Sequence, residues 1–554
     1  MLFRSYLCSS LSKIMPQIGP QCEEYLHAMA LKGECFSFQI AYKTDALGSL
    51  ITIENASDLR DYTQIRGVEL EPVEKMPPMM DEDVVGNTPG LYPDILEDLP
   101  LANKIPAVYN QWRSFWITVR IPKDLPAQTY HFKFQFLASE YNGTEEHRFE
   151  TKTLTLQVIN ATLPAQTTKV THWFHADCIA EYYHIPVFSE QHWKYIAGFM
   201  KNAVEHGMNM ILTPLFTPPL DTAVGSERPT TQLVKISQKD GVFDFDFTQL
   251  TRWIDLAREN GIRYFEFCHL FTQWGATCTP KIMVEVNGKL EKMFGWDVAA
   301  DSQKYQDFLG SFLSSLKKYI ERNQLQDWVY FHCSDEPCKE HLESYTFAAN
   351  FMKKHLAGYK ILDALSDVEF YKRGLVSIPV PPERTFNDFL EVDVPERWIY
   401  YCCGPITEYS NRFIYMTSSR NRALGLLLYK YQVEGFLHWG FNYYYSQYSR
   451  FAIDPYRTAS SYGAFPSGDP FLVYPGQDGR VVDSIRHEIF HDALQDQRAL
   501  QLLETKMPRT EIESMLNQFA HGGKTLELKS YPHGEENMLA AREKINKLIL
   551  QFFG

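Results

Sequence analysis

Two adjacent carboxylic acids, Asp335 and Glu336, close the apolar run WVYFHCSDEP, which extends from Trp328 to Pro337. Neighbouring side chains on a regular strand point to opposite faces, so both acids can face one ligand only where a strand becomes a loop. Pro337 favours this interpretation because it disfavours the helical conformation for Glu336 and holds that residue extended. Since two close carboxyl groups cannot both ionise freely, the pair is suited to acid–base chemistry on a bound substrate.

The pair must be positioned by the elements on either side of it. A strand, a polar tip and a following helix form the βα unit of a (β/α)8 barrel, whose active sites lie at the carboxyl ends of the strands. From residue 168 onward the sequence alternates between such strands and helices. The predicted strands are 169–176, 208–216, 262–271, 328–334, 360–365, 376–380, 398–403 and 435–441, so the pair ends the fourth. The predicted helices between them are 190–206, 247–260, 303–323, 340–356 and 420–433.

The residues before this alternating region have a different rhythm. Apolar and polar residues alternate with a period of two, which predicts half-buried antiparallel strands separated by Pro, Asp and Gly turns. These strands are 34–43, 49–55, 111–121, 130–136 and 153–158, and together they predict a β-sandwich. The stretch 76–100 is rich in Pro, Asp and Glu and is expected to be a long surface loop.

We therefore expect a multidomain fold in three parts. They are an N-terminal β-sandwich over residues 1–165, a (β/α)8 TIM-type barrel over 166–506 and a helical C-terminal extension over 507–554. Residues 272–300 form an insertion after the third barrel strand, in which Asn287-Gly288 predicts a hairpin turn. A helix over 481–506 is expected to close the barrel.

Three motifs give the chain a resemblance to a known family. They are SDEP at 334–337, GFLHWGFNY at 435–443 and SGDPFLVYPG at 467–476. In this order they resemble glycoside hydrolase family 123 and its uncharacterised relatives, which implies a β-N-acetylgalactosaminidase with a β-domain ahead of its barrel. The resemblance implies that Asp335 accepts the N–H of the substrate's acetamide group and stabilises an oxazolinium ion. It implies that Glu336 protonates the leaving oxygen and later deprotonates water.

This mechanism agrees with the spacing of the two acids. Most glycosidases set two carboxyl groups about 5 to 10 Å apart on either side of the bond to be cleaved, which adjacent residues rarely do. A retaining, substrate-assisted mechanism needs no enzyme nucleophile, because the sugar's own 2-acetamido oxygen attacks the anomeric carbon. Cleavage of β-linked N-acetylgalactosamine, or of a related N-acetylhexosamine, is therefore the expected reaction.

Residues near the ends of other predicted strands are candidates for contacts with the sugar. Trp439 is a candidate apolar wall, although a barrel-core tryptophan would have the same sequence context. The remaining candidates are Asn442, Tyr444, His175, His269, Trp274 and Asp363. Each histidine and Asp363 could instead be a hydrogen-bonded structural group.

Two other functions fit the same sequence. In many retaining β-glycosidases the fourth strand ends in Asn-Glu-Pro, and a glutamate near the end of the seventh strand is the nucleophile. Glu336 would then be the acid/base and Glu408 the nucleophile, although Glu408 follows its strand by several residues. A non-catalytic barrel that only binds carbohydrate is the second alternative, because fold does not determine function.

Composition excludes several classes of partner. The 554 residues carry a net charge of −14, which argues against nucleic acid as a partner. The sequence contains no run of 18 apolar residues, so no membrane insertion is expected. No signal peptide is recognised, and the ten cysteines lack paired metal-binding spacing, so we expect a cytoplasmic protein. Neither a metal nor a cofactor is expected, a carbohydrate is the expected partner, and the oligomeric state is not predicted.

Overall fold

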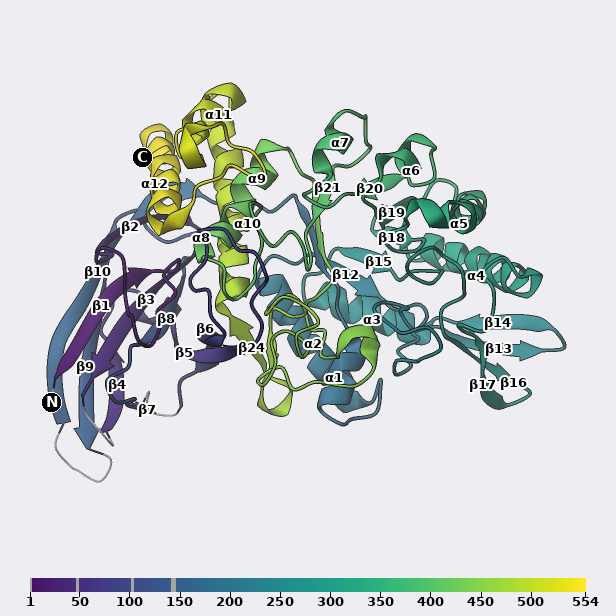
Figure 1. The fold of residues 1–554 in the computed structure, drawn as a ribbon, viewed down its shortest axis with the longest axis horizontal. Coiled ribbons are helices and arrows are strands. Elements are labelled where there is room, and N and C mark those ends of the chain that lie inside the picture. The colour runs from purple at the N-terminus through teal and green to yellow at the C-terminus, as the bar shows by residue number, and fades with distance from the viewer. Residues whose placement is uncertain (1, 46–48, 101–103, 141–145) are drawn as a thin grey trace.

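The computed structural model describes residues 2–45, 49–100, 104–140 and 146–554. Two sheets built mainly from the first part of the chain pack face to face at one end of the molecule (Figure 1). The first has the strand order β1-β3-β8-β5-β6-β24-β23 and the second β2-β10-β9-β4-β7. Their bounds are β1 (Phe3–Ser9), β2 (His27–Lys32), β3 (Cys35–Thr44), β4 (Ser49–Asn55), β5 (Thr63–Val73), β6 (Gly90–Asp98), β7 (Lys104–Pro106), β8 (Arg113–Arg120), β9 (Thr129–Glu140), β10 (Glu146–Thr162), β23 (Tyr474–Pro475) and β24 (Val481–Ser484).

The period-two pattern places the core between these two sheets. Phe132 and Phe134 of β9 are fully buried. Both rings make edge-to-face contacts with Phe38 of the opposite sheet, at centroid distances of 6.1 and 5.9 Å. All five strands predicted in this region are present. One pairing differs from the expectation, because β2 runs parallel to β10.

The prediction of a loop over 76–100 was wrong for its second half, where β6 pairs with both β5 and β24. Pro93 lies beside a register shift in the β5–β6 pairing, and a bulge is one of the few sheet positions that tolerates proline. The Pro, Asp and Glu content of the segment therefore suggested a loop where the structure has a strand. The first half does extend to the neighbouring region, where Asp81 forms an ion pair of 2.7 Å with Arg420.

The prediction of a helix beginning at residue 481 was also wrong. Residues Val481–Ser484 form β24, and helix α10 (Ile485–Glu504) begins immediately after it. The side chain of Ser484 caps the helix by accepting the N–H of His487. The strand lies between β6 and the edge strand β23 of the first sheet, so the chain passes from the sheet directly into this helix.

The middle of the chain contributes two parallel sheets, β11-β22-β21 and β12-β15-β18-β19-β20. Their strands are β11 (Lys169–His172), β12 (Met210–Thr213), β15 (Tyr264–Phe267), β18 (Val329–His332), β19 (Lys360–Ala364), β20 (Ile378–Val380), β21 (Trp398–Tyr400) and β22 (Gly435–His438). Each is shorter than its predicted stretch but lies within it. The two sheets meet at both edges. Beside β11 and β12, the N–H of Asn209 donates to the carbonyl of Val170 at 3.2 Å. Beside β20 and β21, Pro382 forms a β-bridge with Tyr400.

Helices follow the parallel strands along the outside of the sheets (Figure 1). They are α1 (Ala176–Tyr182), α2 (Glu190–Glu205), α3 (Thr248–Glu259), α4 (Gln303–Arg322), α5 (Leu342–His355), α6 (Val368–Lys372), α7 (Phe386–Leu390), α8 (Ser418–Arg422) and α9 (Leu424–Lys430). In α4 the buried residues Tyr305, Phe308, Leu309 and Phe312 recur with helical spacing and form one apolar face. Among the residues with described positions, no helix is both long and apolar enough to cross a membrane.

Two hairpins form a separate four-stranded sheet beside the parallel strands. They are β13 (Lys235–Lys239) with β14 (Val242–Asp246), and β16 (Ile282–Val286) with β17 (Lys289–Phe294). The turn of the second hairpin is Asn287-Gly288, as predicted, with φ angles of 51° and 80°. Positive φ at both central positions is what a two-residue hairpin turn requires.

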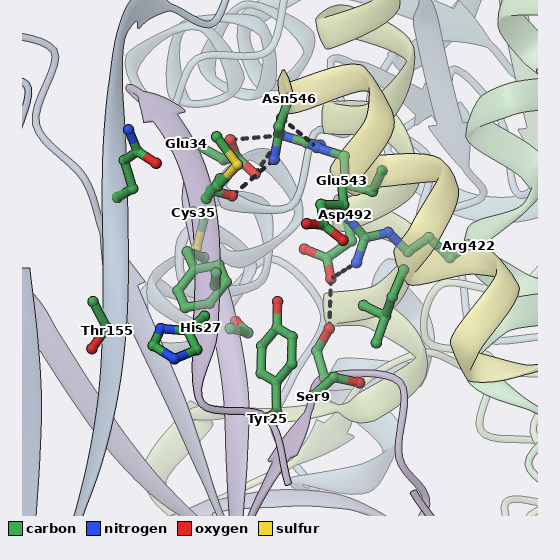
Figure 2. Close-up of a pocket in the computed structure, with 18 of the residues that line it drawn as sticks. Ser9, Tyr25, His27, Glu34, Cys35, Thr155, Arg422, Asp492, Glu543 and Asn546 are labelled. Carbon is green, nitrogen blue, oxygen red and sulfur yellow. Dashed lines mark hydrogen bonds and ion pairs between the residues drawn. The ribbon is translucent and has the colours of Figure 1, made fainter. Parts of the chain in front are cut away.

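The last helices return the chain to the N-terminal sheets, so that α12 (Gly534–Phe553) lies beside β2 and β10 (Figure 1). Arg542 of this helix donates to both carboxylate oxygens of Glu34 at 2.8 Å and also pairs with Asp496 of α10. A cavity of about 330 Å³ lies here, and Figure 2 shows Arg422 paired to Asp492 on its wall. These buried charges join the first sheets to the last helix.

We expect Arg542→Met to lower the free energy of unfolding by about 3 kcal/mol or more, because it leaves the buried Glu34 carboxylate without its partner. The matched control is Lys547→Ala on the same helix, whose ion pair with Glu543 is exposed and is worth about 0.5 kcal/mol. Urea unfolding followed by circular dichroism measures both. Equal losses in the two variants would contradict a structural role for the buried pair.

Candidate active site

A pocket opens where the parallel strands end, and it holds both carboxylic acids identified from the sequence. Asp335 and Glu336 follow β18, which ends at His332. The backbone oxygen of Asp335 accepts the N–H of Trp274 at 2.9 Å, and the N–H of Glu336 donates to Ala364 at 3.1 Å. The pocket is lined by Trp173, His175, Leu220, Asp221, Gln273, Trp274, Asp335, Glu336, Ala364, Tyr400, Cys402, Cys403, Leu437, Trp439, Tyr443 and Phe465.

The backbone of Glu336 differs from the extended conformation that the sequence predicted. Its φ is 43°, in the left-handed region, where a residue with a side chain is strained. Pro337 does disfavour the right-handed helical region, but it leaves this second alternative open. The turn lets two neighbouring side chains line one pocket.

Glu336 has a hydrogen-bond donor inside the pocket. The hydroxyl of Tyr400, the last residue of β21, donates to its carboxylate. Burial, with the nearby Glu336 charge adding to it, raises the pKa of Tyr400 well above its usual range, so the phenol keeps its proton. Tyr400 can therefore orient the carboxyl group that would exchange protons with a substrate.

Asp335 is half-buried on the pocket floor. Desolvation raises the pKa of this carboxyl group well above its usual range, and the negative charges of Glu336, Asp363 and Asp221 raise it further. The unliganded pocket therefore favours retention of a proton within the carboxyl pair. A positive charge developing beside Asp335 would favour its ionised form.

A buried charged network lies directly behind the carboxyl pair. His332 is hydrogen-bonded to Glu266 through Nε2 and to Asp363 through Nδ1, the latter at 3.3 Å. Although burial opposes its charge, Glu266 and Asp363 raise the pKa of His332 to about 9. Asp363 also accepts the N–H of Ser334 at 3.1 Å and the hydroxyl of Tyr345 at 2.6 Å. The network therefore fixes the backbone immediately before Asp335.

Trp439 forms an aromatic wall of the pocket and is half-buried. Its indole N–H donates to Asp469 at 2.9 Å, and its ring packs against Phe465 and Tyr443 at centroid distances of 5.0 and 4.9 Å. Burial raises the pKa of Asp469 to about 7. Trp439 thus presents an apolar face to the pocket while its polar atom is held from behind, and Trp274 also lines the pocket.

His175 lines the pocket, but its ring nitrogens are already engaged. Nδ1 accepts from Arg228 at 3.1 Å and Nε2 donates to the backbone oxygen of Trp439 at 2.9 Å. Burial and the Arg228 charge lower the pKa of His175 to about 3, so it stays neutral. Asn442 is fully buried and binds the backbone N–H and carbonyl of His175, which ties the ends of two strands together instead of facing a sugar.

Other predicted sugar contacts also lie behind the pocket surface. The hydroxyl of buried Tyr444 donates to the carbonyl of Val473 at 2.9 Å, and Asp363 belongs to the network described above. His269 is fully buried, with its ring stacked on His332 at 4.2 Å and edge-on to Trp173. The position of a residue at a strand end did not show whether its side chain faces the pocket or the core.

The structure brings together a set of metal-ligand side chains that sequence spacing did not reveal. One ligand atom each of His269, His332 and Asp363 lies within 4.8 Å of the others. The two imidazole planes differ by only 22° and are stacked, so their in-plane lone pairs do not converge. An ion at the Zn–N distance of about 2.1 Å from both nitrogens would lie well outside both ring planes. We assign this cluster a structural role.

Glu408, the nucleophile of the rival mechanism, lies outside the pocket. It is exposed, its carboxylate pairs with Lys529 of the C-terminal extension at 3.0 Å, and its N–H donates to Asp81. The geometry therefore removes support for Glu408 as a partner of Glu336.

Tyr400 and Asp221 are among the polar side chains of the pocket that sequence reasoning missed. Tyr400 ends the seventh parallel strand, so its strand-end position was a usable signal. Asp221 lies in a loop and accepts the hydroxyl of Tyr443 at 2.6 Å and the N–H of Tyr448 at 2.9 Å. No periodic pattern marks such a loop residue.

The family model described as glycoside hydrolase 123, catalytic domain, matches residues 173–503. A solved family 123 glycoside hydrolase from Clostridium perfringens, described in connection with glycolipid glycan hydrolysis, superposes with a TM-score of 0.74 at 17% identity, covering 100% of this chain and 98% of that one. An FMN-binding β-glucuronidase from Faecalibacterium prausnitzii gives a TM-score of only 0.30 at 8% identity, covering 87% and 61%. Curated proteins gave no match.

The raised pKa of His332 predicts a pH dependence of stability. Its ordinary value is 6.5 and its folded value about 9, so its contribution is complete below pH 6.5 and is lost as the pH rises through 9. The loss should be roughly 3 kcal/mol, at about 1.4 kcal/mol per pKa unit. Urea unfolding at pH 6.5 and 9.5 should show a clearly smaller decline for His332→Gln than for the wild type. The same decline in both would refute the buried imidazolium.

Proposed function

Because the chain belongs to glycoside hydrolase family 123, we propose that it cleaves terminal β-linked N-acetylgalactosamine, or a related N-acetylhexosamine, from a glycan. The observation that carries this proposal is the placement of Asp335 and Glu336 together in one aromatic pocket. Members of the family hydrolyse glycosidic bonds in carbohydrates. Which sugar this chain releases is our proposal.

The proposed mechanism is retaining and substrate-assisted. The acetamide oxygen of the substrate attacks its own anomeric carbon, so the enzyme must stabilise an oxazolinium ion and protonate the leaving oxygen. Asp335 accepts the acetamide N–H and faces the developing positive charge. Glu336, oriented by Tyr400, gives its proton to the leaving oxygen and then takes one from water.

The different exposure of the two acids supports this division of roles. The raised pKa of Asp335 keeps a proton in the pair before substrate binds. As positive charge develops next to Asp335, the ionised form of this group becomes favourable, as its proposed role requires. Glu336 is also the more exposed of the two, as a group that meets a leaving oxygen and then water must be.

The aromatic wall supports an acetamido sugar as ligand. The face of Trp439 offers an apolar surface to the acetamido methyl or to the C–H face of the ring, while Trp274 lines the same pocket. A plain hexose has no acetamido methyl group to place against that surface.

We further propose that the eight parallel strands close into a (β/α)8 barrel that follows a β-sandwich. The support is that each strand has a neighbour on both sides, through the contacts at Asn209 and Pro382. The proposed division is a sandwich over residues 1–165, a barrel over 166–506 and an extension over 507–554. Strand β24 joins the first sheet from within the second of these parts.

Hydrolysis should require the 2-acetamido group, because its oxygen is the proposed nucleophile. We expect release of 4-nitrophenol from the β-N-acetylgalactosaminide and no measurable release from the matching β-galactoside. A panel that adds the β-N-acetylglucosaminide tests the configuration at C4. Comparable turnover of the plain β-galactoside would exclude the mechanism, and binding of N-acetylgalactosamine without any hydrolysis would favour a binding protein.

The two carboxyl groups should differ in their dependence on the leaving group. Glu336→Gln removes the acid, so substrates with poor leaving groups should lose roughly 10²- to 10⁴-fold in kcat/KM, while a dinitrophenyl glycoside is largely spared. Asp335→Asn removes the charge that faces the oxazolinium ion and should cost about 10²- to 10³-fold with every leaving group. The matched control is Glu340→Gln, an exposed acid outside the pocket. Leaving-group dependence confined to the Asp335 variant would reverse the assignment.

A further inference from the structure

Two adjacent cysteines, Cys402 and Cys403, lie in the wall of the candidate active site without a part in the proposed hydrolysis. They come directly after β21, and their Sγ atoms are 3.8 Å apart. Cys403 is exposed and Cys402 is partly buried. Both thiols therefore border the space that a substrate would occupy.

The backbone around the pair is held at several points. The N–H of Cys402 donates to the carbonyl of Gly404 at 3.2 Å, and its own carbonyl accepts from Asn411 at 3.1 Å. Tyr400, which donates its hydroxyl to Glu336, is only two residues away. A change in the conformation of the two cysteines is thus transmitted over a short distance to the proposed acid.

We propose that Cys402 and Cys403 are an oxidation site, which a peroxide converts to a disulfide between neighbouring residues, and that this disulfide suppresses activity at the pocket. The exposed Cys403 thiolate attacks one peroxide oxygen, giving a sulfenic acid and hydroxide. The Cys402 thiol then attacks that sulfur, a disulfide forms and water leaves. In total two thiols and one hydrogen peroxide give one disulfide and two waters, with two electrons passing to the oxidant.

The two thiols are suited to different steps. The hydrogen bond to Cys403, together with burial, raises the pKa of Cys402 well above its usual range. The exposed Cys403 is therefore the thiol that meets the oxidant first, and Cys402 is positioned to resolve the sulfenic acid.

Closing the disulfide requires a local rearrangement. A disulfide bond is about 2.05 Å long, so the sulfurs must approach by nearly 2 Å from their present separation. Adjacent Cα atoms are about 3.8 Å apart, which is shorter than the usual span across a disulfide, so the bond is strained and easily reduced. Formation of this disulfide is therefore expected to be reversible.

The activity part of this inference rests on the proposed function. A displacement of about 1 Å in a catalytic group can lower the rate about 10²-fold. Movement of the Cys402 segment would shift the Tyr400 hydroxyl relative to Glu336 by a distance of this order. We expect oxidation to lower turnover of an aryl β-N-acetylgalactosaminide by roughly ten- to hundredfold.

The test treats the reduced protein with one equivalent of hydrogen peroxide and measures peptide masses and hydrolysis side by side. The peptide with Cys402 and Cys403 should lose two hydrogens, activity should fall, and dithiothreitol should restore both. Cys403→Ser should show neither change relative to its own untreated sample. Cys338→Ser, which removes an exposed cysteine outside the pocket, should respond as the wild type does.

Each outcome decides the proposal. No mass loss on this peptide, or an activity loss that persists in Cys403→Ser, would overturn it, and so would a formed disulfide with unchanged turnover. If the reduced protein hydrolyses none of the aryl glycosides, the proposed function fails. The mass measurement still decides whether the oxidation site exists.

Discussion

The charge on His332 is the constraint on which the candidate site depends. A charged group is costly to bury unless it is paired, and here one imidazolium lies between two carboxylates from neighbouring strands. Glu266 in turn accepts the indole N–H of Trp173 at 2.7 Å, so the network extends across the strands to the pocket wall. Because Asp363 also binds the N–H of Ser334, the same network fixes where the strand ends and where the loop with both acids begins.

Hydrogen bonds hold the side chains of the pocket in place. Glu336, Asp335 and Trp439 line the cavity. Glu336 is held by Tyr400, which lines the cavity too, whereas Asp335 is held through its backbone and Trp439 by a residue behind the wall. Asp469, for example, is fully buried and binds the indole of Trp439. Such supporting groups determine the geometry to within the small tolerances that catalysis requires.

The sequence predicted what depends on local chemistry. The eight parallel strands and the turn at Asn287 follow from hydrophobic runs and turn residues, and the position of the acids follows from the strand end. It failed where partners distant in the chain decide the outcome. β6 was not predicted because its Pro93 is tolerated only beside a bulge in the strand pairing. Asn442 was predicted to bind a sugar, but its side-chain amide is hydrogen-bonded to the backbone of His175. Only tertiary contacts carry that information.

The pairing of Glu34 with Arg542 spans 508 residues of sequence. The chain must lose much conformational entropy before two residues this far apart in sequence can meet, and such long-range contacts slow folding. On the ribosome, β2 and β10 emerge well before α12, the helix that packs against them, so this face of the sheet stays uncovered during that interval. The buried ion pairs of Arg542 therefore form late, and the polar side chains that line the cavity beside α12, Ser9 and Thr155 among them, suit a surface that is in contact with water until then.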